Sequence, residues 1–257
     1  MQKQYVGDIG DYIKYALLRY ITGTNKLGVV WYLHPNQKRK NDGKHTDYLK
    51  KSKIWRHYDT ALFDELKDIV ERGRRSVHEV KTRNIIQAEV SIDDMLCCEE
   101  NAQKKSYCDD CSSKKEDCRA CSSRKDREIW RKAWFDRALE ELVGCKIVFA
   151  DPDNGLCLGE KFRVRQPKYW KRLPLQEGLR LSGGRTAILY HHNTRFKGGH
   201  PKEVECWLSE LPQKSMALYF NAYSCRTFFI VNPTEDIRNR TQSFAERWSK
   251  HVSLLTK

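Results

Sequence analysis

The chain has 257 residues, 39% hydrophobic and 32% charged, which is the composition of a globular protein of one or two domains. Its 48 Lys and Arg residues outnumber its 34 Asp and Glu residues, so the formal net charge is +14. The apolar runs are too short to span a bilayer and no signal-peptide pattern opens the chain, so we expect a cytoplasmic protein with no membrane partner. The positive charge favours a polyanion, and we predict nucleic acid, RNA or DNA, as the partner. The alternative is a basic surface without such a partner.

The first half of the chain predicts two helices. Apolar residues recur at three- and four-residue steps over residues 8–21, and Gly23 follows as a terminator. A short buried strand is expected over 27–33, followed by a polar loop. Residues 60–72 predict a second amphipathic helix, and 75–92 one or two weak strands.

The second half alternates between the two element types. Helical periodicity returns at 127–143, and apolar runs at 145–150 and 185–190 predict buried strands. The other expected elements are helices around 168–179 and at 200–211, a C-terminal β-hairpin, and a last helix at 234–251.

This alternation predicts the fold class. Strands that alternate with helices are typical of an α/β domain with a mostly parallel sheet covered on both faces. We therefore expect one Rossmann-like domain over residues 1–257, with the strands at 27–33, 145–150 and 185–190 adjacent. The C-terminal antiparallel hairpin is expected at the edge of the sheet.

Residues 93–125 are an inserted segment of a different kind, because they hold six of the ten cysteines and almost no aliphatic residues. Two CxxC pairs lie six residues apart, and four thiolates with this spacing are typical of a structural zinc site. The predicted zinc ligands are Cys108, Cys111, Cys118 and Cys121, and the adjacent Cys97 and Cys98 are possible substitutes for one pair. Four unrelated surface thiols are the alternative. Lys104, Lys105, Lys114 and Lys115 make this segment a candidate nucleic-acid contact.

Polar strings follow two of the predicted strands, at the sheet edge where α/β proteins bind ligands. The string DPDNG after 145–150 supplies Asp151, Asp153 and Asn154 as candidate catalytic residues, with a plain turn as the alternative. His191 and His192 follow the next strand. Because neighbouring side chains on a strand point to opposite faces, we expect only one of the two histidines in the ligand crevice.

The order of motifs resembles a known family. The string GDxGDYxKY lies on the first helix, a strand–DP turn comes in mid-chain, and a late strand ends in IVNP. This order is similar to that of the bacterial methyltransferases that modify an adenine amino group of large-subunit ribosomal RNA. Those enzymes have a Rossmann-like sheet, an N-terminal segment that helps form the active site, and a DPPY motif.

The resemblance implies roles for individual residues. Asp151 corresponds to the aspartate that accepts a hydrogen bond from the target amine, while Asp153 and Asn154 replace the second proline and the base-stacking aromatic of DPPY. It further implies S-adenosylmethionine as cofactor. The residues expected to edge the cofactor pocket are Asp11, Lys14, Asp42 and His45. The glycine-rich turn usual after the first strand is replaced here by HPNQKRKNDGKH.

Two other functions remain open from the sequence. The first is a nuclease or phosphodiesterase dependent on Mg²⁺ or Mn²⁺, held by Asp151, Asp153 and one histidine with acids of the first helix or Asp42. Lys14 or Arg195 would stabilise phosphate charge in that case. The second is a non-catalytic Rossmann-like protein that binds nucleic acid or a protein partner.

Overall fold

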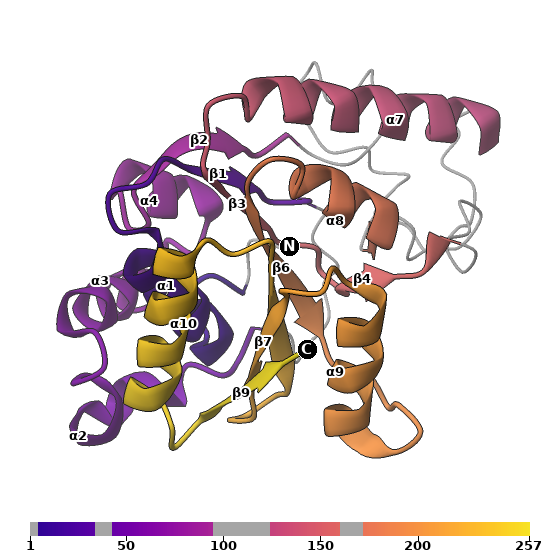
Figure 1. The fold of residues 1–257 in the computed structure, drawn as a ribbon. Coiled ribbons are helices and arrows are strands. Elements are labelled where there is room, and N and C mark those ends of the chain that lie inside the picture. Colours follow the sequence, from indigo (N-terminus) through magenta and orange to yellow (C-terminus); the bar gives the residue numbers. More distant parts are fainter. Residues whose placement is uncertain (1–4, 34–42, 95–123, 160–171) are drawn as a thin grey trace.

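A seven-stranded sheet runs through the centre of the protein (Figure 1). The computed structural model describes residues 5–33, 43–94, 124–159 and 172–257. In spatial order the strands are β2 (Ala88–Ile92), β1 (Leu27–Val30), β3 (Ile147–Ala150), β6 (Thr186–His192), β8 (Arg226–Val231), β7 (Met216–Phe220) and β9 (Val252–Thr256).

The strand directions divide the sheet into two parts. Strands β2, β1, β3 and β6 pair in parallel, whereas β8 is antiparallel to both β6 and β7, and β9 is antiparallel to β7. The expected adjacency of the strands β1, β3 and β6 is confirmed. The predicted hairpin forms as β7 and β8, so the structure is a mixed α/β sheet with parallel and antiparallel strands.

The predicted position of the hairpin at the sheet edge is wrong. Strand β9 pairs with β7 through all five of its residues and forms that edge instead. The helix expected at 234–251 ends earlier, because α10 spans Glu235–Arg247. The chain then turns and extends, and Val252 is buried against the sheet. So short a strand directly after a helix leaves too little periodicity to be recognised in the sequence.

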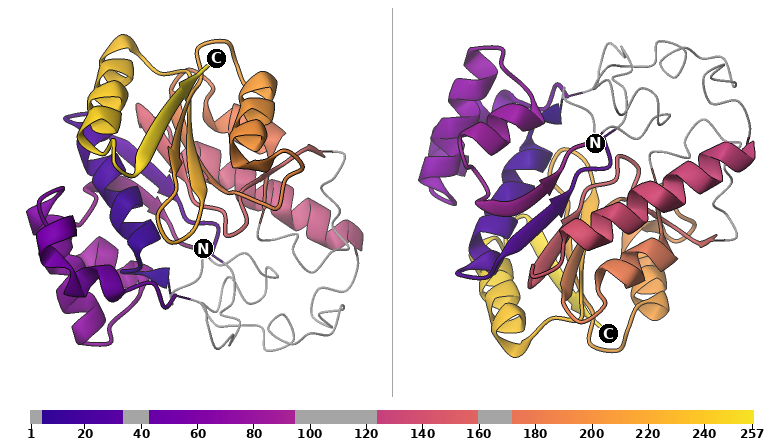
Figure 2. Two further views of the ribbon diagram at one scale, coloured as in Figure 1. Left: turned by 90° about the horizontal axis from the view of Figure 1, so that it is seen from below. Right: turned by 90° about the horizontal axis from the view of Figure 1, so that it is seen from above.

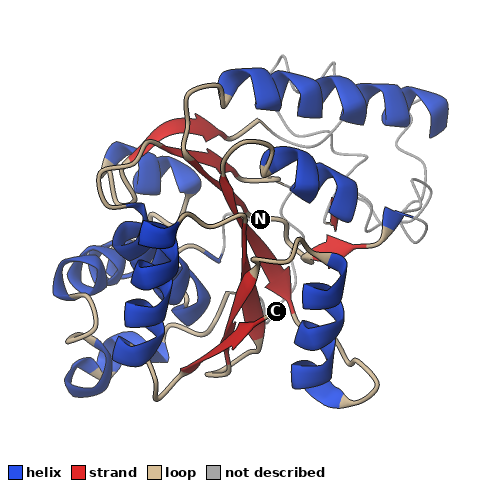
Figure 3. Ribbon diagram, in the orientation of Figure 1, coloured by secondary structure: helices blue, strands red, loops and turns tan. Residues whose placement is uncertain are grey.

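Helices cover both faces of the sheet (Figures 1 and 3). On one face lie α1 (Ile9–Thr22), α3 (Thr60–Glu71), α4 (Val77–Thr82) and α10; on the other lie α7 (Arg124–Glu141), α8 (Leu175–Leu181) and α9 (Gly199–Glu210). Each face has its own apolar core. Along β3, Ile147 and Phe149 enter one core and Val148 and Ala150 the other, because successive side chains on a strand alternate.

Smaller elements correct two further expectations. The segment 75–92 forms one helix, α4, before the strand β2. The helix expected at 168–179 begins only at Leu175, because Leu173–Pro174 is extended as β5 and pairs with β4 (Leu156–Cys157). A 3-10 turn η2 (Asp47–Lys50) and α2 (Ser52–Trp55) complete the described elements. None of the described helices combines the length and apolar character needed to cross a membrane.

The carboxyl ends of the parallel strands meet at one edge of the sheet. Strand β3 ends at Ala150 and β6 at His192, and β8 begins at that same edge, since Arg226 is paired with His192. Figure 2 shows this arrangement from two further directions, with α1 beside the sheet. The edge therefore receives residues from α1, from the turn after β3, from the end of β6 and from the turn between β7 and β8.

Candidate active site

The first turn of α1 is fixed by a buried N-cap. The Asp8 carboxylate accepts hydrogen bonds from the backbone N–H groups of Gly10, at 2.7 Å, and Asp11, at 3.1 Å. An aspartate here satisfies backbone donors that a helix start leaves without intrahelical partners. Burial raises the pKa of Asp8, and the nearby Arg226 guanidinium, 4.0 Å away, acts against that rise. This cap places the next turn of α1 against the sheet edge.

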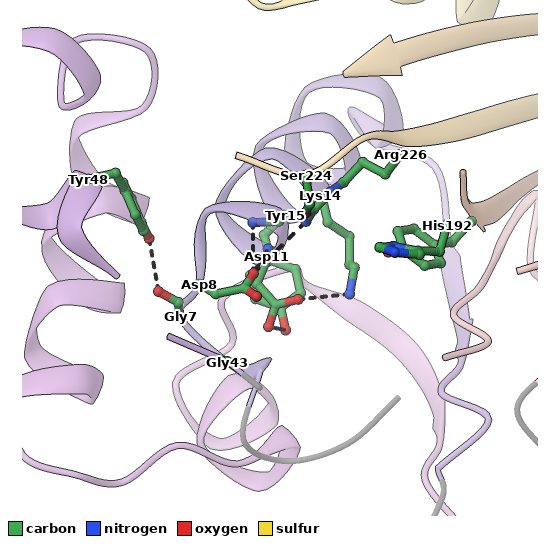
Figure 4. Close-up of polar contacts among 12 residues, drawn as sticks. Gly7, Asp8, Asp11, Lys14, Tyr15, Gly43, Tyr48, His192, Ser224 and Arg226 are labelled. Atoms are coloured by element: carbon green, nitrogen blue, oxygen red, sulfur yellow. Dashed lines mark hydrogen bonds and ion pairs between the residues drawn. The ribbon is translucent and has the colours of Figure 1, made fainter. Parts of the chain in front are cut away.

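Lys14 joins α1 to the end of β3. Its ammonium lies 2.8 Å from Asp11 Oδ1 and 2.9 Å from Asp151 Oδ2, and the three side chains are almost fully buried, at 6%, 3% and 2% exposure. The hydroxyl of Tyr15 donates to the second oxygen of Asp11 at 3.1 Å. Figure 4 shows Asp11, Lys14 and Tyr15 together on α1. We call Asp11, Lys14 and Asp151 the acid–lysine cluster.

The acid–lysine cluster has a distinct electrostatic character. Burial acts to lower the pKa of Lys14, but Asp11 and Asp151 outweigh it and raise that pKa above its ordinary value. Burial raises the pKa of Asp151, while Lys14 works in the opposite direction. The lysine is therefore a permanent cation. The aspartate is an acceptor whose affinity for a proton exceeds that of an exposed carboxylate.

Arg226 closes one side of the cluster. A Cβ on Gly10 would lie 1.1 Å from Nη1 of Arg226, so the glycine leaves the space that the guanidinium occupies. Arg226 donates from Nη2 to Ser224 Oγ, while its buried Nε has no hydrogen-bond partner among the described residues. Arg226 is thus a buried cation, at 5% exposure, beside the first turn of α1.

The two histidines have different surroundings, as expected for neighbours on a strand. His191 is buried, its Nδ1 accepts from the backbone N–H of Leu156 at 3.1 Å, and its Nε2 lies 3.2 Å from Glu203 Oε1. Burial lowers the pKa of His191, so it is held as the neutral tautomer that donates to Glu203. Both ring nitrogens are used inside the protein, and His191 is a structural residue here.

His192 is the exposed end of β6 and faces the candidate site (Figure 4). Its Nδ1 lies 3.4 Å from the hydroxyl of Tyr190, and the Tyr190 ring centre lies 5.4 Å from the Lys14 ammonium. Asp153 and Asn154 are half-buried in the turn after Asp151. The structure therefore brings Asp151, Lys14 and Asp11 into direct contact and places His192 next to them through Tyr190.

The residues expected around a cofactor are only partly described. The backbone of His45 accepts from the N–H of Ile9 at 3.0 Å, which places this exposed histidine beside the start of α1. Asp42 lies outside the described residues. At the end of β1 the side chains of Trp31 and Tyr32 are buried, at 1% and 0% exposure. Most of the string HPNQKRKNDGKH, which stands in place of the glycine-rich turn, lies outside the described residues.

No family model, no curated protein and no solved structure matches this chain. The function is therefore inferred from the geometry of the site.

Metal binding was predicted for the cysteine-rich segment. Cys108, Cys111, Cys118 and Cys121 lie outside the described residues, so the zinc site stays a prediction, as does the basic finger around it. Within the described ranges, no three His, Cys, Asp or Glu side chains are grouped in a way that would hold a metal ion.

Two buried charged residues near this edge were not predicted from the sequence. Arg226 is a lone charge at the head of an apolar run, and Glu203 lies in an ordinary amphipathic helix segment. The position of Arg226 at the start of a predicted strand was an available signal, because a strand that starts with an arginine at the ligand edge delivers a cation to that edge. Glu203 offered no such signal.

Proposed function

We propose that the protein modifies a base of RNA or DNA, in the manner of the S-adenosylmethionine-dependent methyltransferases that act on an amino group. The observation that carries the proposal is the buried contact of Lys14 with both Asp11 and Asp151, at the carboxyl edge of the sheet. This contact joins the two strings, GDxGDYxKY and DPDN, on which the family resemblance rests. They are 137 positions apart in the chain and adjacent in space.

Asp151 is suited to hold an amino group. An exocyclic base amine donates hydrogen bonds, and the carboxylate of Asp151 accepts them at the end of β3. The amine loses a proton when a new bond forms at its nitrogen, and the raised pKa of Asp151 makes this carboxylate a better acceptor for that proton. S-adenosylmethionine would supply the methyl group.

Lys14 has a positioning role in this proposal. Its ammonium is held by Asp11, so the cation stays in place when Asp151 turns one oxygen toward a substrate. The same contact makes a metal-dependent nuclease the less favoured alternative. The cation between these two carboxylates is the lysine of the protein, whereas a nuclease of that type uses such carboxylates as metal ligands.

The charge of the molecule supports a nucleic-acid substrate. With a net charge of +14 the protein attracts polyanions. Exposed basic residues also lie on the loops at the candidate edge, namely Lys44 before η2 and both Arg195 and Lys197 after β6. A single-stranded or flipped base next to Asp151 would have its flanking phosphates near these side chains.

The experiment compares Asp151→Asn with Asp11→Asn. Each change removes one of the two carboxylates of Lys14 and keeps the shape, so a purely structural cluster predicts equal consequences. We expect Asp151→Asn to lower methyl transfer to total RNA or denatured DNA about 100-fold or more, and Asp11→Asn to lower it far less.

The measurement is the transfer of labelled methyl groups, with calorimetry of S-adenosylmethionine binding to each variant. Equal losses in the two variants would contradict a role of Asp151 at the reacting amine. A wild-type protein that binds no S-adenosylmethionine but cleaves nucleic acid with Mg²⁺ or Mn²⁺ would establish the nuclease instead.

A further inference from the structure

Two of the five large hydrophobic side chains exposed among the described residues belong to loops at the candidate edge. Phe196, at 37% exposure, follows β6, and Tyr223, at 42%, lies in the turn between β7 and β8. The two loops are in contact, because the N–H of Asn193 donates to the carbonyl of Cys225 at 3.2 Å. Exposed rings among basic residues, here Arg195 and Lys197, are the arrangement with which proteins bind single-stranded nucleic acid.

Tyr223 is held in place by other rings. Its ring centre lies 5.8 Å from that of His45 and 6.3 Å from that of Trp55, and Trp55 is itself stacked on His251 at 4.3 Å. The backbone of Tyr223 has φ +64°, a left-handed conformation that is unusual for a tyrosine. The rest of the turn and its aromatic neighbours therefore hold an exposed ring that local preferences alone would not place there.

The turn connects Tyr223 to the acid–lysine cluster. The next residue, Ser224, accepts a hydrogen bond from Arg226, and the Arg226 guanidinium lies over Gly10 in the first turn of α1. His45, whose ring lies 5.8 Å from that of Tyr223, accepts a hydrogen bond through its carbonyl from the N–H of Ile9 in the same turn. Both contacts place the turn of Tyr223 beside the start of α1, where Figure 4 shows Ser224 and Arg226 next to Lys14.

We propose that Tyr223 stacks on the base that enters the acid–lysine cluster. Asn154, in the turn after Asp151, has no ring with which to stack on a base, whereas Tyr223 presents an exposed ring from another element. Tyr223 supplies that ring from the turn between β7 and β8. This inference rests on the proposed function. The ligand that Tyr223 would stack on is an unpaired base of a single strand.

The test uses a single-stranded oligoadenylate that carries one 2-aminopurine, whose fluorescence falls when the base stacks on a ring. We expect wild type to quench the probe, and Tyr223→Ala to abolish the quenching and weaken binding by about 5- to 150-fold. Tyr223→Phe keeps the ring and should stay within about twofold of wild type. Because no charge changes, the salt dependence of binding should be the same in all three proteins.

Tyr20→Ala is the matched control, because Tyr20 is a tyrosine of similar exposure, 37%, near the other end of α1. Equal binding and quenching by Tyr223→Ala and Tyr20→Ala would overturn the inference, and so would a wild-type protein that does not bind the probe at low salt. If quenching depends on Tyr223 but the protein transfers no methyl group, the stacking site is supported and the proposed reaction is refuted.

Discussion

Two buried polar clusters lie at the ends of neighbouring strands, and the pKa values of their carboxylates are shifted in opposite directions. Around Glu203, one carboxylate accepts from His191, from the side chain of Asn193 and from both the N–H and the hydroxyl of Thr194. These contacts lower the pKa of Glu203 to about 2, against the effect of its burial. In the acid–lysine cluster, burial leaves the pKa of Asp151 raised, and the adjacent Arg226 keeps an unused donor among the described residues.

The difference separates a structural cluster from a candidate reactive one. A buried charge whose acceptor sites are all filled by fixed donors stabilises a single conformation and has little capacity for a ligand. A carboxylate with a raised pKa beside a cation is able to exchange its partner for a substrate group. The position of a polar residue at the sheet edge is therefore not enough, and the direction in which its surroundings shift its pKa separates the two roles.

The largest effect is expected from removing the cation of the acid–lysine cluster. Lys14→Met leaves Asp11 and Asp151 buried without their counter-charge, and we expect a loss of about 3–5 kcal/mol in the free energy of unfolding. Urea denaturation measures this loss. Adding Asp151→Asn removes one of the uncompensated charges, so the double variant should be more stable than Lys14→Met alone. A double variant that is less stable would refute the electrostatic account.

The turn that joins the two clusters gives the next largest effect. Gly155 has φ +77°, and a Cβ there would lie 2.7 Å from both the Cα of His191 and the backbone N of His192. Gly155→Ala should lower the free energy of unfolding by about 2–4 kcal/mol, from backbone strain together with the clash. Gly184→Ala is the control, since Gly184 has φ +70° and open space around the added Cβ. Equal losses in thermal unfolding would show that the contact with β6 is unimportant.

A smaller effect tests the neutral state of His191. Because burial lowers the pKa of His191 from its ordinary 6.5, the folded protein binds fewer protons than the unfolded chain. The resulting stability is present above about pH 6.5 and is lost as the pH falls toward the folded pKa. His191→Gln keeps an acceptor for Leu156 and a donor for Glu203 but does not titrate.

The measurement is the free energy of unfolding between pH 7 and pH 5, above the range in which Glu203 titrates. Wild type should lose more stability than His191→Gln over this range, at up to about 1.4 kcal/mol per pH unit. His78→Gln, at an exposed position on α4, is the control. Parallel curves for wild type and His191→Gln would mean that His191 is not held neutral by the fold.

The sequence by itself predicted most of the element types and a candidate site at one edge of the sheet. The apolar stripe of α1, the buried runs of β1, β3 and β6, and the DPDN turn after β3 are local patterns that depend on residues a few positions apart. The rule that parallel strands deliver their following residues to one edge then predicted Asp151 and one of the two histidines at the same edge. The alternation of side chains on a strand separated His191 from His192.

Only the tertiary structure decided which side chains meet. The contact of Lys14 with Asp151 joins positions 137 residues apart, and Arg226 and Tyr223 reach the same edge because β8 pairs with β6. Glu203 lies in a helix whose sequence carries no sign of its buried carboxylate. Such contacts depend on strand order and on the docking of helices against the sheet. Neither of these produces a periodic pattern or a motif spacing that could be recognised in the sequence.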